Sequence, residues 1–239
     1  MSASDYRYNA RTHVGLRRKV NEDAVLALPE QDIWVVSDGM GGHEAGDFAS
    51  RLITDTVASI PAGLKPADRM HALRDVIARA HQMILKEADA RGRGVIGATV
   101  AALMLAEGHF VGLWAGDSRI YRVRDGRIEM LTTDHSAVAV FVAAGTMTWD
   151  EAEQHPQSNA ITRAVGVGDA VELDKVRGET SKGDRFLLCS DGLTKYATFG
   201  MLEKALSEMP IETVTDHLMS VALAGGGADN ISIIVVDVL

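Results

Sequence analysis

The sequence predicts an α+β fold, because strand-like and helix-like patterns occupy separate blocks of the chain. Residues 48–60 and 67–90 carry apolar side chains every three or four positions, as a helix with one buried face requires. Residues 95–132 instead contain short apolar runs that are typical of strands. Within this block, Asp125 and Gly126 predict a tight hairpin, since both residues tolerate positive φ. Strands grouped with strands favour antiparallel sheets over a parallel α/β sheet.

The other elements follow from the same patterns along the chain. Pro61 and Gly63 end the first helix, and Pro156 follows a short helix in a segment rich in Ala and Val. The expected strands are 24–28, 33–37, 95–106, 110–115, 118–124, 127–132, 171–176, 185–189 and 231–238. Further helices are expected at residues 149–154, 200–208 and 212–224.

Composition limits the classes of protein to which the chain can belong. The 239 residues fit one domain spanning 1–239, and 46% of them are hydrophobic, enough for a sizeable core. The formal net charge is −9, and no run of Lys and Arg is long enough to give the basic face of a nucleic-acid binder. No apolar stretch reaches the ~18 residues that a membrane span needs. The single cysteine, Cys189, and an N-terminus without an apolar signal region lead us to expect a cytoplasmic protein.

Acidic residues recur where the predicted strands begin or end. These residues are Glu22, Asp23, Asp38, Asp117, Asp191 and Asp229. Strand ends are rigid, so several carboxylates placed there can converge on one point. Converged carboxylates repel one another unless a cation lies among them. Ligands that are all oxygen, without a Cys or His cluster, favour hard cations such as Mg²⁺ or Mn²⁺.

A simpler interpretation applies to any one of these aspartates. Asp-Gly is a common turn dipeptide, and Asp125-Gly126 is assigned to a turn because a predicted strand flanks it on each side. For Asp38 and Asp191 taken singly, a turn and a metal site are equally supported. The residues that flank them therefore decide between the two interpretations.

Short motifs surround these acidic residues and extend over the chain. They are GLRRKVNED (15–23), SDGMGGH (37–43), AGDSR (115–119), LTTDHS (131–136), HP (155–156), ITRAVG (161–166), CSDGL (189–193) and ADNIS (228–232). In this order they resemble the metal-dependent protein phosphatases of type 2C, and the resemblance covers residues 10–238. Each motif alone is weakly specific, whereas the ordered set is highly specific. The DGMGGH form and the compact length resemble the bacterial members.

The resemblance implies a four-layer αββα sandwich, in which helices cover the outer faces of two antiparallel sheets. It also implies a flap segment at about 136–160, beside a cleft that holds two metal ions at one end of the sheets. Asp38 would bridge both cations, and the carbonyl of Gly39 would bind one of them. Asp191 and Asp229 would complete the second metal site.

The resemblance assigns further roles around these ions. Glu22 and Asp23 would hold metal-bound waters, and two cations that share a water would make hydroxide available near neutral pH. Asp117 would support a third, weaker Mn²⁺ or Mg²⁺ ion, as in bacterial members. For Asp117 the alternative is a structural role at the neighbouring hairpin, and both roles stay open.

Two residues are candidates for contact with the substrate. Arg18 fits the family's phosphate clamp, since a guanidinium can grip two phosphate oxygens, while the adjacent Arg17 points the other way on an extended chain. His43 is a candidate general acid, because Met40 stands where many eukaryotic relatives carry a histidine. A metal-bound water could serve as the acid instead, and His43 could equally cap the following helix.

The function implied by the resemblance is hydrolysis of phosphoserine and phosphothreonine in proteins, opposing a bacterial serine/threonine kinase. The expected partners are phosphorylated proteins and that kinase, with neither nucleic acid nor membrane, and we expect a monomer. A cysteine phosphatase is disfavoured, because Lys195 rather than arginine lies six residues after Cys189. A hydrolase of small phosphate esters, a non-catalytic regulatory module and activity on phosphotyrosine stay open as alternatives.

Overall fold

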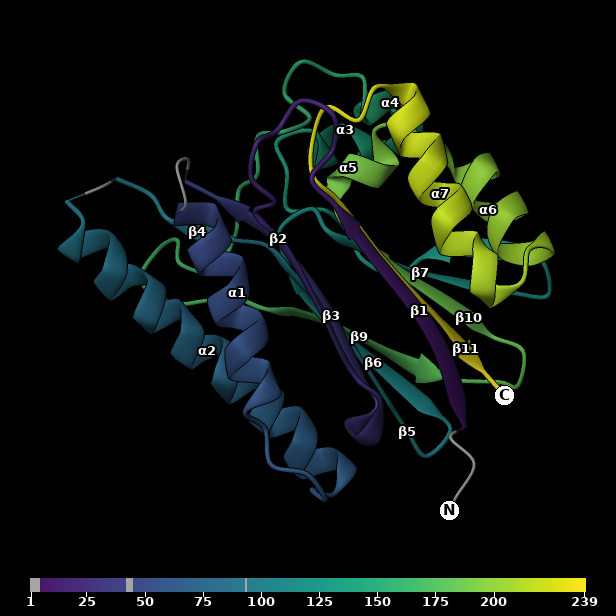
Figure 1. Ribbon diagram of the computed structural model, residues 1–239, viewed down its shortest axis with the longest axis horizontal. Coiled ribbons are helices and arrows are strands. Elements are labelled where there is room, and N and C mark those ends of the chain that lie inside the picture. The colour runs from purple at the N-terminus through teal and green to yellow at the C-terminus, as the bar shows by residue number, and fades with distance from the viewer. Residues whose placement is uncertain (1–4, 42–44, 93) are drawn as a thin grey trace.

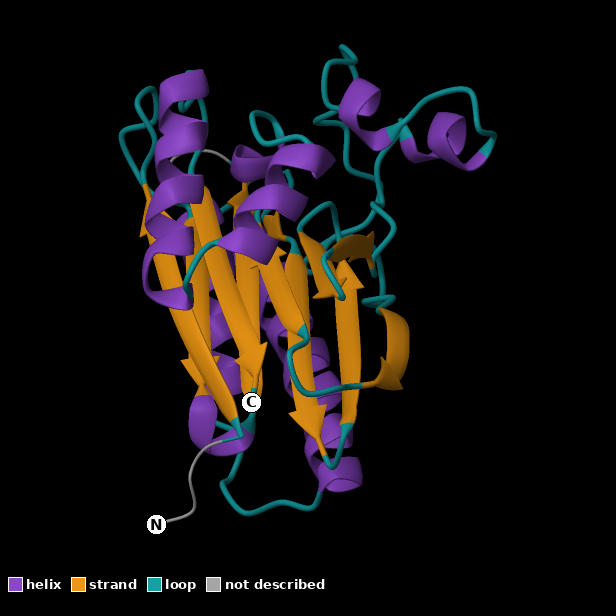
Figure 2. Ribbon diagram, turned by 90° about the vertical axis from the view of Figure 1, so that its right-hand side faces the viewer, coloured by secondary structure: helices purple, strands orange, loops and turns teal. Residues whose placement is uncertain are grey.

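The computed structural model describes residues 5–41, 45–92 and 94–239, and it confirms the four-layer α+β architecture. Two antiparallel sheets face each other, and helices cover both outer faces, as Figures 1 and 2 show. Three apolar clusters lie between successive layers: one between each sheet and its helices, and one between the two sheets. The expected sandwich is therefore present, and the acidic residues gather at one end of its two sheets.

The first sheet has the strand order β2-β3-β5-β6-β9, and β4 pairs with β3 beside it. Its strands are β2 (Asp23–Leu28), β3 (Ile33–Met40), β4 (Gly97–Ala98), β5 (Val100–Ala106), β6 (His109–Ala115) and β9 (Asp174–Glu179). The short helix η1 (Pro29–Gln31) connects β2 to β3. Ile33 and Val35 point to the helix side, whereas Trp34 and Val36 point to the other sheet. This alternation explains why β3 is apolar throughout.

The second sheet has the strand order β1-β11-β10-β7-β8. Its strands are β1 (Tyr6–His13), β7 (Arg119–Arg124), β8 (Arg127–Met130), β10 (Arg185–Cys189) and β11 (Ile231–Val238). The turn between β7 and β8 has positive φ at both Asp125 and Gly126, as expected from this dipeptide. Phe186, Leu188 and Ile234 project inward against the first sheet.

The helices form the two outer layers and a group at one end of the molecule. Two helices, α1 (Ala45–Ala58) and α2 (Pro66–Ala90), cover the first sheet, while α6 (Phe199–Glu208) and α7 (Ile211–Gly225) cover the second. The short helices α3 (Ala139–Ala143), α4 (Trp149–Ala152) and α5 (Asp191–Thr194) lie together near one end of the sheets (Figure 1). None of the helices in the described part of the chain is long and apolar enough to cross a membrane.

The predicted strands of the first sheet differ from the structure at two places. The strand expected over 95–106 is interrupted at Thr99, whose N–H donates to the Asp38 carbonyl and whose hydroxyl accepts from the Asp38 N–H. The strand expected to end at Ser37 continues to Met40, because it gains β4 as a new partner. Asp38 is therefore held inside a strand and not after one.

Of the strands at the sheet edges, β1 and β9 were not predicted accurately. β1 was not expected at all, and β9 begins at Asp174, three residues later than the predicted start at 171. Val171 and Leu173 suggested the earlier start. Both residues precede β9 and pack against the apolar cluster between the first sheet and its helices. Edge strands are partly exposed and rich in polar residues, so their patterns are weak.

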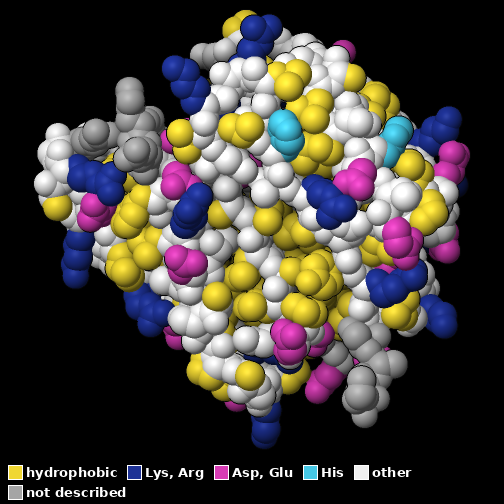
Figure 3. Space-filling view, in the orientation of Figure 1, with side chains coloured by type: hydrophobic (Ala, Val, Ile, Leu, Met, Phe, Trp, Pro, Cys, Tyr) yellow, Lys and Arg dark blue, Asp and Glu magenta, His cyan; other side chains and the backbone are white. Residues whose placement is uncertain are grey.

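Charged side chains are mixed over the face that Figure 3 shows. Lys and Arg lie among Asp and Glu there, and the described residues of this face form no continuous basic stripe. The absence of a basic stripe from the described part of this face is in line with the acidic character of the chain, whose formal net charge is −9.

Candidate metal centre

Backbone pairing fixes Asp38 and its neighbours at one end of the first sheet. Asp38 lies opposite Asp23 in the pairing of β3 with β2, and the Gly39 N–H donates to the carbonyl of Glu22 over 3.1 Å. On the other side, Thr99 and Asp38 exchange hydrogen bonds of 2.8 and 2.9 Å. Asp38 is thus held from both sides with little freedom to move.

The second sheet supplies Asp191 and Asp229 to the same place. Asp191 begins α5 directly after β10, and Asp229 precedes β11. Asn230 joins the two sheets, because its side-chain oxygen accepts from the Glu22 N–H over 2.8 Å. Its amide nitrogen donates to the carbonyls of residues 14 and 20, which anchors the loop that carries Arg18.

An acidic cleft of about 260 Å³ lies between the ends of the two sheets. Its lining includes the predicted site residues Arg18, Glu22, Asp38, Gly39, Asp117, Asp191 and Asp229. Asp23 lies behind this lining, buried, where its carboxylate accepts a 2.8 Å hydrogen bond from the Ser190 hydroxyl. His43 lies outside the described residues. Distant segments of the chain thus meet at one cleft, as the strand-end positions predicted.

Crowding of negative charge changes the acidity of these carboxyl groups. Burial, and then the nearby charges of Asp23 and Asp191, hold the pKa of Asp38 well above its usual value. Burial and Asp191 likewise hold the pKa of Asp117 well above its usual value. Burial raises the pKa of Asp23 to about 7, although hydrogen bonds from serine hydroxyls oppose the rise. A positive charge bound in the cleft would offset the repulsion among these carboxylates.

Unpartnered oxygens indicate where that charge would bind. Glu22 Oε1, Asp23 Oδ1 and Asp191 Oδ1 are buried and have no hydrogen-bond partner among the described residues. Buried acceptors without a partner are costly, and a cation or its water would satisfy them. The donor set is all oxygen, so the residues fit Mg²⁺ or Mn²⁺. As the side chains stand, no group of three or more His, Cys, Asp or Glu residues within the described ranges could hold a metal ion.

Two basic side chains pair with carboxylates of the cleft. Lys195 Nζ lies 2.6 Å from Asp191 Oδ2 and 3.4 Å from Asp229 Oδ2. Arg18 contacts both oxygens of Asp229, each over 2.9 Å. The hydrogen bond to Asp229 is the main cause of a raised pKa at Arg18. Arg18 therefore lies at the cleft as predicted, but it is already paired with a predicted metal ligand.

Arg119 connects the cleft to the flap segment. Its guanidinium donates to both carboxylate oxygens of Asp134 and lies 2.7 Å from Glu153 on the flap segment. A small hollow beside these groups is also lined by Asp117 and Asp191. The flap segment is thus fixed at the edge of the acidic cleft, which Asn159 and Ile161 help to line.

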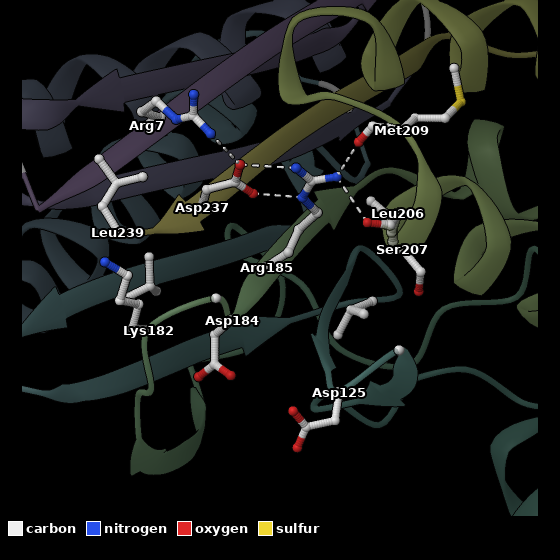
Figure 4. A pocket seen from close by; sticks show the side chains of 14 residues that line it. Arg7, Asp125, Lys182, Asp184, Arg185, Leu206, Ser207, Met209, Asp237 and Leu239 are labelled. Carbon is white, nitrogen blue, oxygen red and sulfur yellow. Dashed lines mark hydrogen bonds and ion pairs between the residues drawn. The ribbon is translucent and has the colours of Figure 1, made fainter.

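A second hollow, of about 410 Å³, lies at the other end of β10 and β11 (Figure 4). Its arginines are already neutralised: Arg185 pairs with Asp237 over 2.5 and 2.9 Å and donates to two backbone carbonyls of α6 and the residue after it. Arg7 contacts the same carboxylate from β1. This hollow offers an anionic ligand less free positive charge than its composition suggests.

Known proteins are similar to this chain in sequence and in its αββα sandwich. A family model described as protein phosphatase 2C matches residues 14–226. The serine/threonine protein phosphatase PstP of Mycobacterium tuberculosis is 36% identical over 238 residues, covering 98% of this chain and 45% of PstP. The serine/threonine phosphatase stp of Listeria monocytogenes is 34% identical, covering 95% of this chain and 94% of that protein.

Solved structures agree with these sequence matches. PppA, described as a key regulatory component of T6SS in Pseudomonas aeruginosa, has a TM-score of 0.91 at 42% identity, covering 98% of both chains. The catalytic domain of PstP in complex with two manganese ions has a TM-score of 0.84 at 33% identity, again covering 98% of both chains. The chain belongs to the protein phosphatase 2C family. It spans less than half the length of PstP.

Some residues that shape the cleft were not among the predicted site residues. The side chains of Thr99 and Asn230 accept hydrogen bonds from the backbone N–H groups of Asp38 and Glu22, and so position these residues. No local sequence pattern reveals such contacts. Lys195 could have been found, because it lies four residues after Asp191 and such pairs share one face of a helix.

Proposed function

We propose that this protein hydrolyses phosphoserine and phosphothreonine in proteins with the help of Mn²⁺ or Mg²⁺. The observation that carries the proposal is the convergence of Asp38, Asp191 and Asp229 on one cleft, where Asp191 Oδ1 is buried without a partner among the described residues. Asp38 would contact both cations, the Gly39 carbonyl would bind one of them, and Asp191 and Asp229 would complete the site of the second. Two such cations, when bound, lower the pKa of a water that they share, which makes hydroxide available near neutral pH.

The residues of this chain would bind the substrate phosphate, orient water and protonate the leaving group. Arg18 is half exposed at the cleft and presents a guanidinium suited to two phosphate oxygens. Asp23 and Glu22 would orient water at the base of the cleft, since each has an oxygen without a partner in the part of the chain that the structure describes. Asp117 would hold a third, weaker cation. His43 or a water would protonate the leaving serine or threonine oxygen.

The wider context of the reaction is part of the same proposal. The substrates would be phosphorylated proteins, supplied by a serine/threonine kinase that this enzyme opposes in the cytoplasm. The single cysteine is buried and unpaired, as a reducing compartment favours. We propose that the enzyme acts as a monomer, without nucleic acid or membrane.

The decisive experiment measures phosphate release from a phosphothreonine peptide. We expect activity with Mn²⁺, loss of activity in EDTA, and recovery when Mn²⁺ is restored. Asp38→Asn should abolish turnover, whereas alkylating reagents should leave turnover intact, since Cys189 is fully buried and burial raises the pKa of its thiol. Full activity in excess chelator would refute the mechanism. Rapid hydrolysis of small phosphate esters with no activity on phosphopeptides would instead support a small-molecule hydrolase.

A further inference from the structure

Lys195 places a positive charge inside the acidic cleft. Its side chain is only 16% exposed, and its Nζ lies 2.6 Å from Asp191 Oδ2 and 3.4 Å from Asp229 Oδ2. The backbone N–H of Lys195 donates to the Asp191 carbonyl over 3.0 Å, so one helical turn carries the side chain back over the carboxylate. Burying an ammonium requires partners with negative charge, and these two aspartates supply them.

Lys195 contacts one oxygen of each aspartate, but only Asp191 keeps a second oxygen without a partner in the described part of the chain. Lys195 binds Asp191 through Oδ2, while Asp191 Oδ1 stays buried and without a partner among the described residues. Asp229 is gripped by Lys195 and also by Arg18. The two carboxylates that would complete a metal site are therefore already paired with the positively charged side chains of Lys195 and Arg18.

We propose that Lys195 is a tethered counter-cation, which occupies the space between Asp191 and Asp229 when no metal is bound and which metal binding must displace. This inference rests on the metal site of the proposed function. An ammonium carries one positive charge, so it neutralises part of the repulsion among the carboxylates without matching a divalent ion. Metal binding is then an exchange of cations: the protein loses the Lys195 pair and gains the metal ligands.

The exchange has two consequences that can be measured separately. Lys195 stabilises the metal-free fold, because it offsets repulsion that would otherwise favour unfolding. It also weakens metal affinity, because its contacts must be broken and because its charge repels the incoming ion. A protein built this way would stay folded when metal is scarce and would release metal more readily.

Lys195→Met tests both consequences, because methionine keeps an unbranched side chain of similar length and removes the charge. Calorimetric titration with Mn²⁺ should show affinity about tenfold tighter in the variant than in wild type, the scale expected for one charge removed at short range. Thermal unfolding in EDTA should show a melting temperature lower by about 2–4 °C in the variant than in wild type.

Lys182→Met is the matched control. Lys182 is exposed in the turn before β10, at the end of that strand opposite to Asp191, and the substitution removes the same charge. We expect it to leave Mn²⁺ affinity and the metal-free melting temperature near their wild-type values. Equal changes in both variants would mean that net charge alone is responsible, and would overturn the inference.

The outcomes separate this inference from the proposed function. If wild type binds Mn²⁺ and Lys195→Met binds it equally or more weakly, Lys195 is not a competing cation. If neither protein binds Mn²⁺, the metal site of the proposed function fails. In that case the melting temperatures in EDTA still test the counter-cation, and an unchanged value in Lys195→Met would overturn it.

Discussion

Arg119 on β7 lies 2.7 Å from a carboxylate oxygen of Glu153 on the flap segment, and both side chains are buried, at 5% and 9% exposure. The same guanidinium grips Asp134 and lies 5.0 Å from the centre of the Trp149 ring. An ion pair this well shielded holds its partners more firmly than a surface pair does. The position of the flap segment beside the acidic cleft therefore depends on a residue of the second sheet.

Glu153→Gln should loosen the flap segment while leaving both sheets intact. Glutamine fits the same space but removes the charge that faces Arg119, at a cost of about 2 kcal/mol for a buried, charge-assisted contact. Hydrogen exchange should accelerate over residues 136–160 and stay unchanged in β10 and β11. Gln154→Ala, at an exposed neighbouring position, is the control. Equal exchange in the two variants would show that Glu153 does not anchor the segment.

Asp117→Ala should reduce turnover without disrupting the two-metal site. Asp117 is buried at the cleft, where the charge of Asp191 helps to raise its pKa, so its removal takes away one repulsive partner. Crystals of the variant grown with Mn²⁺ should contain two ions. Turnover equal to that of wild type would favour the alternative role, in which Asp117 supports the structure of the neighbouring hairpin.

Arg18→Ala should weaken substrate binding through loss of the phosphate contact. We expect KM to rise about tenfold, as the loss of one charge-assisted contact implies. A side chain that contacted only phosphate would leave metal affinity unchanged, but the structure pairs Arg18 with Asp229. Release of Asp229 should therefore tighten Mn²⁺ binding slightly, which calorimetry can measure. Arg17→Ala, at an exposed position, should change neither quantity.

His81 should make the fold less stable in mild acid. It is buried on α2 and accepts a 2.9 Å hydrogen bond from the Gly166 N–H through Nδ1, and burial lowers its pKa. As pH falls through ~6.5, the unfolded chain takes up a proton at this histidine while the folded chain resists, so stability decreases. His81→Gln should lose less stability than wild type between pH 7.5 and pH 5.5 in thermal unfolding. The same substitution at exposed His109 should leave the wild-type slope unchanged.

Buried elements were predictable from the sequence because their apolar spacing is imposed by the layers between which they lie. The strand predicted at 185–189 matches β10, and the helix predicted at 67–90 matches α2 within one residue. β1 was missed because an edge strand buries less of itself and carries few apolar residues. Strong patterns thus reflect burial, and the polar edge strand β1 lacks one.

The acidic cleft was predictable to a lesser extent. Asp38 and Asp191 could be placed near each other because motif order and strand ends locate backbone positions. The pairing of Lys195 with Asp191 and of Arg119 with Glu153 depends on which side chains meet after folding. Such contacts join separate elements or compete with a bound ion, and motif spacing does not reveal them.

Neutralising single carboxylates of the cleft should have opposite effects on the metal-free fold, depending on what each carboxylate contacts. The pKa of Asp38 is held well above its usual value by burial and by four neighbouring carboxylates, so its charge opposes folding. Asp38→Asn in EDTA at pH 8 should therefore melt higher than wild type, and it should lose the gain in melting temperature that Mn²⁺ gives.

Asp191→Asn should do the reverse in EDTA. Repulsion alone would predict stabilisation here too, but Asp191 is the closest partner of the buried Lys195 ammonium, at 2.6 Å. Removing its charge leaves that ammonium with the longer contact to Asp229. Breaking a shielded pair costs more than the relief of repulsion returns, so the variant should melt lower than wild type. Thermal unfolding of both variants, with and without Mn²⁺, measures the two effects side by side. A higher melting temperature for Asp191→Asn would mean that repulsion among the carboxylates outweighs the Lys195 pair.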